Sequence, residues 1–240
     1  MKIPTITGVI DRRILLNYRI DPDVLAGVLP APFHPVTVRD SAIGGICLIR
    51  LKSVRPKTCV PFISIDSENA AHRFAVSFEQ DGIAKEGVYI PRRDTSSLLS
   101  SLTGGSIFPG EHHHSAFSVR ETDTEYEVRM QAADGTTIEV RGSADGQFPE
   151  DSVFEDLEEA SAFFERGCLG YSRTSRPGRF DGLTLKVFHW QVSCLSVADV
   201  RSSYLKDTRI FPAGSVVFDH ALLMLGLEHE WHSEEDLCVS

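Results

Sequence analysis

The sequence predicts a mainly β fold of the α+β class, in which the strands pair largely antiparallel. Two observations lead to this prediction. Apolar and β-branched runs of strand length recur along the whole chain, separated by turns rich in Gly, Pro and Asp. Stretches with the 3.6-residue periodicity of a helix are fewer and short. Since strands that follow one another through short connections form antiparallel pairs, this pairing is expected for most of the sheet.

The expected strands are spread along most of the chain. In chain order they cover residues 14–20, 43–51, 72–79, 88–91, 116–120, 126–130, 138–141, 169–173, 183–190 and 192–200. The best-defined pair is the hairpin of 126–130 with 138–141. Its connection contains Asp134-Gly135, a dipeptide that tolerates the positive φ of tight turns.

Two short helices follow from cap and stop signals. Asp21-Pro22 supplies an acceptor side chain and a proline at the first helical position, and Pro30 ends this helix. A second helix is expected over about 96–102, where it stops at Gly104.

A longer helix is expected over 153–166. Ser152 is the expected cap, and Glu155 completes a capping box with it. Apolar residues then fall on one stripe until Gly167 ends the helix.

Length, composition and charge indicate one domain over 1–240 that does not bind nucleic acid. The chain has 240 residues, of which 42% are hydrophobic, enough to bury a core in a single domain. The net charge is -10 and the Lys and Arg residues are scattered, whereas phosphate binding needs clusters of them. No apolar run approaches the roughly 20 residues that cross a bilayer, so we expect no membrane partner and a cytoplasmic location.

Cysteine usage gives no sign of a metal or redox centre. The five cysteines are an odd number at irregular spacing and include no C-x-x-C pair. We expect reduced thiols, with Cys47 and Cys194 acting as small hydrophobes in apolar strands. No cofactor is expected.

The segment 98–119 is the expected place of a small-molecule pocket, because a helix there runs through a glycine break into three histidines and a strand. Strand alternation puts His72 on the core face of its strand, and if the extended backbone reaches back to Glu68, that carboxylate points the same way. Desolvation would then raise the pKa of Glu68 and suit it to proton transfer. The alternative is a solvated glutamate in a loop before the strand.

The three adjacent histidines alternate between two faces. His113 falls on the apolar face, either as a hydrogen-bonded core residue or as an acid or base of the pocket. His112 and His114 share the other face as an H-x-H pair, but zinc needs a third and usually a fourth ligand and no motif supplies one. We therefore expect no metal.

Lys186 offers another route to chemistry. A lysine in an apolar pocket can form a Schiff base, and Lys186 has the strand parity of Phe188 and Trp190. The alternative is a solvent-facing lysine whose aliphatic stem lies along those rings.

Three stretches together resemble the acetoacetate decarboxylase-like superfamily, in particular its uncharacterised YqjF-like branch. They cover most of the chain. The first is Asp11-Arg12-Arg13-Ile14-Leu15-Leu16-Asn17-Tyr18-Arg19-Ile20-Asp21 before Leu29-Pro30, the second is Ser67-Glu68-Asn69 with Arg73, and the third is Gly167-Cys168-Leu169-Gly170-Tyr171 leading through Arg179 to His189-Trp190.

The resemblance implies a cone or closed barrel of antiparallel strands with a few peripheral helices and a pocket inside. It also implies a Schiff-base lysine after the helix at 96–102, assisted by a glutamate that matches Glu68. This chain has no lysine from Ser96 to Arg120, and the strand that carries a second acid in decarboxylases has Gly44, Gly45 and Cys47 instead. Only Glu68 carries over, so decarboxylation through an imine is not expected.

The sequence therefore predicts a small-molecule pocket protein, with acid/base chemistry on a small carbonyl or carboxylate compound as its expected activity. Glu68 is the expected general acid or base and His113 its partner. Arg12, Arg13 and Arg73 are candidates to hold an anionic group, with surface arginine as the alternative. The expected substrate-binding residues are Arg12, His72, Arg73, His114 and Trp190.

Two alternatives stay open at this point. One is a non-catalytic ligand-binding or scaffold protein that keeps only the shape of the pocket. The other is a Schiff-base enzyme that uses Lys186. Assembly into a homo-oligomer is left open as well.

Overall fold

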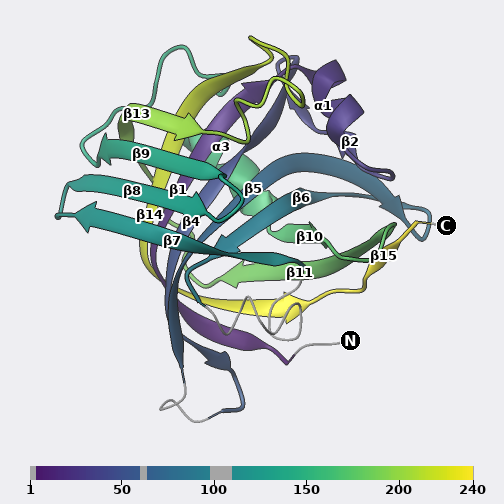
Figure 1. Ribbon diagram of the computed structural model, residues 1–240, viewed down its shortest axis with the longest axis horizontal. Coiled ribbons are helices and arrows are strands. Elements are labelled where there is room, and N and C mark those ends of the chain that lie inside the picture. Colours follow the sequence, from purple (N-terminus) through teal and green to yellow (C-terminus); the bar gives the residue numbers. More distant parts are fainter. Residues whose placement is uncertain (1–3, 60–63, 98–109, 240) are drawn as a thin grey trace.

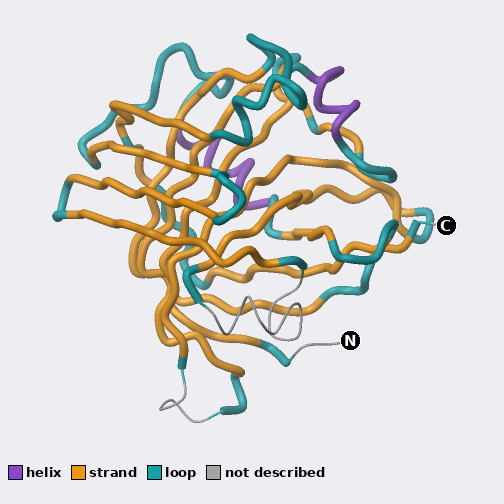
Figure 2. Tube along the Cα trace, in the orientation of Figure 1, coloured by secondary structure: helices purple, strands orange, loops and turns teal. Residues whose placement is uncertain are grey.

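The computed structural model describes residues 4–59, 64–97 and 110–239, and its strands form one 15-stranded sheet (Figures 1 and 2). Seven of the strands make a closed ring, because β5 pairs with both β4 and β6. The ring order is β6-β10-β11-β14-β1-β4-β5. Its strands are β1 (Ile6–Ile20), β4 (Ser41–Pro56), β5 (Ile65–Gln80), β6 (Ile83–Thr95), β10 (Leu169–Arg173), β11 (Arg179–Val187) and β14 (Val216–Ser233).

Four further strands of this sheet extend from β6 and fold over the ring as a separate layer, called the second sheet below, at the left of Figure 1. They are β7 (His112–Glu121), β8 (Glu125–Ala132), β9 (Thr137–Ser143) and β13 (Ser196–Ser202). Their apolar side chains, such as Val128 and Val140, share a buried cluster with Leu16 and Leu48 of the ring. The short strands β2 (His34–Pro35), β3 (Thr37–Val38), β12 (Ser193–Cys194) and β15 (Leu237–Cys238) pair at the margins.

The mainly β fold with few helices is confirmed. The ladders between neighbouring ring strands are mostly antiparallel, as expected. β6 is the exception, since it pairs in parallel with both β7 and β10. The expected strand over 183–190 ends earlier, at Val187, and the one over 192–200 is divided into β12 and β13. A single domain over 1–240 stays a prediction.

The hairpin predicted around Asp134-Gly135 is confirmed. β8 and β9 pair with Val128 opposite Val140 and Met130 opposite Ile138. Gly135 has a φ of 88°, the left-handed conformation for which the dipeptide was singled out.

Helix α1 (Pro22–Val28) has the predicted cap, and α3 (Leu157–Arg166) does not. The Asp21 side chain accepts the N–H groups of Asp23 and Val24 at 2.9 and 3.2 Å. In α3 the cap is Asp156, so the capping box of Ser152 and Glu155 is wrong.

The reason for the later start of α3 is a competing contact. The hydroxyl of Ser152 donates to Asp219 on β14 at 2.7 Å, which ties it to the sheet instead of to the helix. The other predicted helix, over 96–102, falls almost entirely on residues outside the described ranges.

Strand β14 (Val216–Ser233) was not predicted as a strand, although it is 18 residues long. Its central run, residues 221–227, consists largely of Ala, Leu and Met, which are good helix formers and not β-branched. Both faces of this run are largely buried, so the alternation of apolar and polar residues that marks a half-exposed strand is missing.

Four of the ring strands, β1, β4, β5 and β14, are buried on both faces over long stretches. Along β1, Leu16 faces the second sheet, whereas its neighbour Leu15 belongs to a separate cluster on the opposite face. That second cluster includes Ala75 of β5 and Phe164 of α3. The face of β1 that does not meet the second sheet is therefore an inner face, not a solvent face.

No helix within the described ranges is long and apolar enough to cross a membrane.

Close approach of β1 to β4 depends on Gly45. A Cβ at this position would lie 2.1 Å from the carbonyl oxygen of Leu16, a backbone atom that cannot move without breaking the ladder. We expect Gly45→Ala to lower the free energy of unfolding by roughly 2 kcal/mol or more, in the range of overpacked cores.

The matched control is Gly27→Ala in helix α1, where an added Cβ meets nothing within 4 Å. It should leave stability unchanged or raise it by up to about 1 kcal/mol, because alanine is the better helix former. Urea unfolding of the three proteins measures both effects, and an equal response to the two substitutions would contradict the packing argument.

Candidate active-site cavity

A cavity of about 130 Å³ lies inside the ring. Each of the seven ring strands contributes at least one residue to its wall, which is possible only for a space that the ring encloses. The volume is close to the roughly 150 Å³ of an engineered cavity that binds benzene, so a small organic molecule fits. Its wall includes Arg13 (β1), Cys47 (β4), Asn69 and Arg73 (β5), Arg93 (β6), Gly170 (β10), Leu185 (β11) and Trp231 (β14).

Helix α3 closes one side of the cavity through Phe164. The Phe164 ring lies 4.8 Å from the guanidinium carbon of Arg73, a cation–π contact. A second cavity of about 80 Å³ lies beside the first and shares Arg13, Arg73 and Phe164 with it. The two arginines therefore border empty space on more than one side.

Three arginines face the cavity, and among the described residues none of them has a carboxylate within ion-pair distance. Arg13 donates from Nε to the sulfur of Cys47 at 3.3 Å. Arg73 donates to the side-chain oxygen of Asn17 at 2.6 Å, and Arg93 donates to the hydroxyl of Ser172 at 2.9 Å. None of the three acceptors is a carboxylate, so no ion pair among the described residues balances these three positive charges.

Burial lowers the pKa of Arg73 to about 10, and burial has the same effect on the pKa of Arg93, also to about 10. Both guanidinium groups are still protonated at neutral pH. The Nε atom of Arg73 is buried and has no hydrogen-bond partner in the described part of the chain.

One carboxylate, Asp94, belongs to the wall of the cavity, but it is already engaged. Arg92 donates to both of its oxygens at 2.8 Å, and the hydroxyl of Ser115 donates to it at 2.9 Å. Asp94 therefore balances Arg92 and not the three arginines of the cavity.

A buried chain of hydrogen bonds holds Arg73 in place. The Asn17 side chain accepts from Arg73 through Oδ1, and its Nδ2 lies 3.0 Å from Nε2 of His220. Nδ1 of His220 lies 2.6 Å from the carboxylate of Asp219. The amide of Asn17 can satisfy both neighbours only if Nε2 of His220 accepts, which requires the imidazole to carry its proton on Nδ1, toward Asp219.

His112 is the histidine of the 112–114 run that faces the cavity. Its Nδ1 lies 3.3 Å from the carbonyl oxygen of Gly110, to which it donates. Burial, together with the charge of Arg93, lowers the pKa of His112 to about 4, so the imidazole is neutral at pH 7. A neutral imidazole at this place is a potential proton acceptor.

Glu68 does not face this cavity, contrary to the expectation from strand parity. Its carboxylate is held by Arg12 and Arg50, each at 2.6 Å, and both arginines also pair with Glu121 of β7. The parity argument joined Glu68 and His72 correctly on one face of β5, but the cavity lies on the other face, with Asn69 and Arg73. The Arg12–Arg50–Glu68–Glu121 cluster instead joins the ring to the second sheet.

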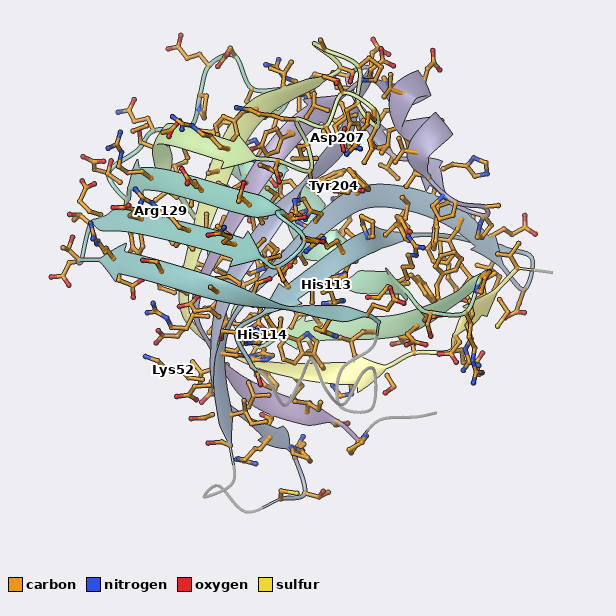
Figure 3. All side chains as sticks on the ribbon, in the orientation of Figure 1. Lys52, His113, His114, Arg129, Tyr204 and Asp207 are labelled. Atoms are coloured by element: carbon orange, nitrogen blue, oxygen red, sulfur yellow. The ribbon has the colours of Figure 1, made fainter. Side chains whose placement is uncertain are left out.

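His113 and His114, which Figure 3 labels on β7, are both exposed. Neither is among the residues that line the cavity, and Glu68 is not among them either. His113 has the parity of the buried Ser115, but it stands near the start of the strand and is exposed.

Two other expected binding residues are buried elsewhere. Arg12 is 1% exposed and bound to Glu68 and Glu121, as described. His72 is fully buried toward the second sheet, with Nε2 3.1 Å from the hydroxyl of Ser202, and burial lowers its pKa to about 4.

Trp190 and Lys186 lie outside the ring cavity. Trp190 donates from its indole nitrogen to Ser161 of α3 at 3.0 Å and stacks 5.9 Å from the guanidinium of Arg13. Lys186 is exposed, with its amine 5.5 Å from the centre of the Phe188 ring, which is the solvent-facing arrangement.

The described ranges contain no group of three or more His, Cys, Asp or Glu residues that could hold a metal ion. The cavity offers arginine, histidine and thiol groups to a ligand, and no lysine appears among its described wall residues.

A family model described as an uncharacterized conserved protein matches residues 9–216 of this chain. The chain belongs to the DUF2071 family. No curated protein matches its sequence.

Solved structures similar to this DUF2071 chain are acetoacetate decarboxylase-like. The acetoacetate decarboxylase of Legionella pneumophila matches with a TM-score of 0.65 at 9% identity, over 99% of this chain and 88% of its own. An acetoacetate decarboxylase-like enzyme of Sphingomonas wittichii RW1 has a TM-score of 0.63 at 10% identity, over 99% and 93%. The enduracididine biosynthesis enzyme MppR, complexed with pyruvate, has a TM-score of 0.61 at 10% identity, over 100% and 92%. The resemblance to this superfamily is confirmed at the level of the fold.

Sequence reasoning named Arg13 and Arg73 as possible anion ligands but missed Arg93, Cys47 and His112 as residues of the cavity. Strand parity relates Arg73 to Asn69 and Ala71, and Cys47 to Ile49 and Leu51. Strand parity does not show which of two buried faces borders a cavity, so Arg93, Cys47 and His112 could not be assigned to it from the sequence.

The cluster of Glu68 with two arginines predicts a structural role for this carboxylate. We expect Glu68→Gln to lower the free energy of unfolding by roughly 1.5–3 kcal/mol, because Arg12 is buried and loses a charged partner. The control is Glu125→Gln, at an exposed position of β8 without an ion pair among the described residues, which should change stability little. Urea unfolding at neutral pH measures both, and wild-type stability of Glu68→Gln would refute the role.

Proposed function

We propose that the ring cavity binds a small organic anion, most simply a short carboxylate compound that carries a carbonyl group. The observation that supports this is the set of three arginines, Arg13, Arg73 and Arg93, that face one cavity without a balancing carboxylate among the described residues. Segments outside the described ranges contain no Asp or Glu side chain either. Burying positive charge without a partner is costly, and a bound carboxylate removes that cost.

The chemistry of the wall favours a compound with an apolar part. Around the arginines lie aliphatic side chains such as Ile49, Ile90 and Leu185. A ligand with a carboxylate at the guanidinium groups and a short carbon skeleton against the aliphatic side chains would match both parts of the wall. Similarity to MppR, which was solved with pyruvate, supports pyruvate as a first probe.

Arg73→Gln tests the proposal. Pyruvate should raise the thermal unfolding temperature of the wild-type protein, and we expect the variant to bind pyruvate about ten- to a hundredfold more weakly, the effect of losing a hydrogen bond to a charged group. Titration calorimetry with pyruvate and with uncharged acetone gives the two affinities. The control is Arg129→Gln, an exposed position on β8 in the second sheet that Figure 3 labels, and it should bind as the wild type does.

A second variant separates charge from packing. Asn17→Asp keeps the size of the side chain that Arg73 contacts but gives Arg73 a carboxylate partner within the protein. Because this carboxylate balances the charge of Arg73, the substitution should also weaken pyruvate binding. The proposal is wrong if acetone binds as tightly as pyruvate, or if neither substitution changes the affinity for pyruvate.

Acid/base chemistry on the bound carbonyl compound is the second candidate function, and neutral His112 at the cavity favours it. The imidazole would accept a proton from the carbon next to the carbonyl group, while the arginines stabilise the enolate oxygen that results. Glu68 and His113, the pair expected from the sequence, lie away from the cavity, so we assign this role to His112 instead. No lysine is required for the step.

Hydrogen–deuterium exchange separates this enzyme from a non-catalytic binding protein. In deuterated buffer, proton NMR should show faster loss of the pyruvate methyl signal with wild-type protein than without it, and His112→Gln should abolish the difference while pyruvate binding persists. General base catalysis contributes about a hundredfold or more to such steps. Binding without any exchange above background would favour the non-catalytic alternative.

A further inference from the structure

Cys47 of β4 lies at the point where the three arginines of the cavity converge. It is 8% exposed, belongs to the wall of the cavity, and accepts a hydrogen bond from Nε of Arg13 at 3.3 Å. No acceptor for its own S–H proton is present among the described residues.

Strand register explains the convergence. Cys47 pairs with Leu15 of β1 on one side and with Ala71 of β5 on the other. Arg13 and Arg73 each stand two residues along from those partners, which places both on the same face as Cys47 and at the diagonal positions next to it.

Arg93 completes the group from one strand further away. It pairs with Ala71, so that Cys47, Ala71 and Arg93 form one row across β4, β5 and β6. Because the side chain between them is only a methyl group, the long arginine can extend over it toward the sulfur.

A second cysteine of the same cavity has the opposite surroundings. The thiol of Cys168 donates to the carbonyl oxygen of Glu165 at 2.7 Å, and burial raises its pKa. The Cys168 thiol is directed to a carbonyl oxygen, whereas the Cys47 sulfur itself accepts a hydrogen bond from a guanidinium group. Of the two sulfurs, Cys47 is the one that stands among the positions of all three arginines.

We propose that Cys47 is a nucleophilic site that reacts with the electrophilic carbon of a small anion held by Arg13, Arg73 and Arg93. The inference rests on the proposed anion-binding function and adds a covalent step to it. With a 2-oxo carboxylate, sulfur would bond to the carbonyl carbon, the π electron pair would move to oxygen, and the thiol proton would end on that oxygen. The product is a hemithioketal, with no leaving group and no change in oxidation state.

Charge-selective alkylation tests this site in the intact wild-type chain. Iodoacetate and iodoacetamide have nearly the same size and both form an S–C bond with loss of iodide, but only the first is an anion. Peptide mass spectrometry gives the rate at each of the five cysteines. We expect the ratio of the iodoacetate rate to the iodoacetamide rate to be about tenfold or more higher at Cys47 than at Cys59 or Cys238, since a cationic cleft concentrates anions.

The chain supplies its own controls. Cys59 and Cys238 are exposed, and Cys194 is 9% exposed, as buried as Cys47, but is not part of the cavity. Cys194 should react slowly with both reagents in the native protein. Arg13→Gln and Arg73→Gln should each lower the ratio at Cys47, and Cys47→Ser should remove the labelled peptide.

Two results would overturn the inference. One is a Cys47 that reacts with neither reagent in the native protein but with both in urea, and the other is a ratio at Cys47 equal to that at the exposed cysteines. Calorimetry with pyruvate on the wild-type protein distinguishes the two proposals. Binding of pyruvate without labelling of Cys47 would remove the nucleophile and leave the anion site, whereas failure of both would remove the anion site as well.

Discussion

Closure of the ring through the β5–β6 pairing is the constraint on which the rest of the structure depends. A strand in an open sheet can leave one face to water, but a ring strand has an inside and an outside, and here the second sheet covers much of the outside. Both faces of β1, β4, β5 and β14 are therefore buried over long stretches. The cavity exists because the inner face is not filled completely by α3 and the aliphatic side chains, and what remains empty is bordered by arginines.

The distribution of charge inside and outside the ring follows from this closure. The chain as a whole carries a net charge of -10, yet its inner cavity gathers three guanidinium groups. On the outer face the same residue type is neutralised, since Arg12 and Arg50 share Glu68 and Glu121. Arg12 and Arg13 are adjacent in sequence and point to opposite faces, so the alternation of a single strand separates an ion-paired arginine from one that lines the cavity.

Local features were predictable from the sequence, and features that depend on closure were not. The Asp21 cap and the Asp134-Gly135 hairpin are decided within a few residues, and both are confirmed. β14 escaped recognition because its helix-forming central run is held as a strand by partners on both sides, β1 and β11. Parity correctly placed Glu68 and His72 on one face of β5. It could not show that the cavity lies on the opposite face, because that follows only from the closed ring.

The arginines of the cavity, and the absence of lysine among its described wall residues, determine what it can do with a carbonyl compound. A guanidinium group is a poor nucleophile that stays protonated at neutral pH, so it cannot form an imine but can stabilise an oxyanion next to it. If a proton were removed from the neighbouring carbon, or if a sulfur added to the carbonyl carbon, the displaced electron pair would move to the carbonyl oxygen. In an imine mechanism it would move to the iminium nitrogen instead. The Asp219–His220–Asn17 chain supports this role, because it fixes Arg73 through a neutral amide and leaves the positive charge uncompensated. Had a carboxylate stood in place of Asn17, the arginine would be held equally well, but it would have no charge to offer a ligand.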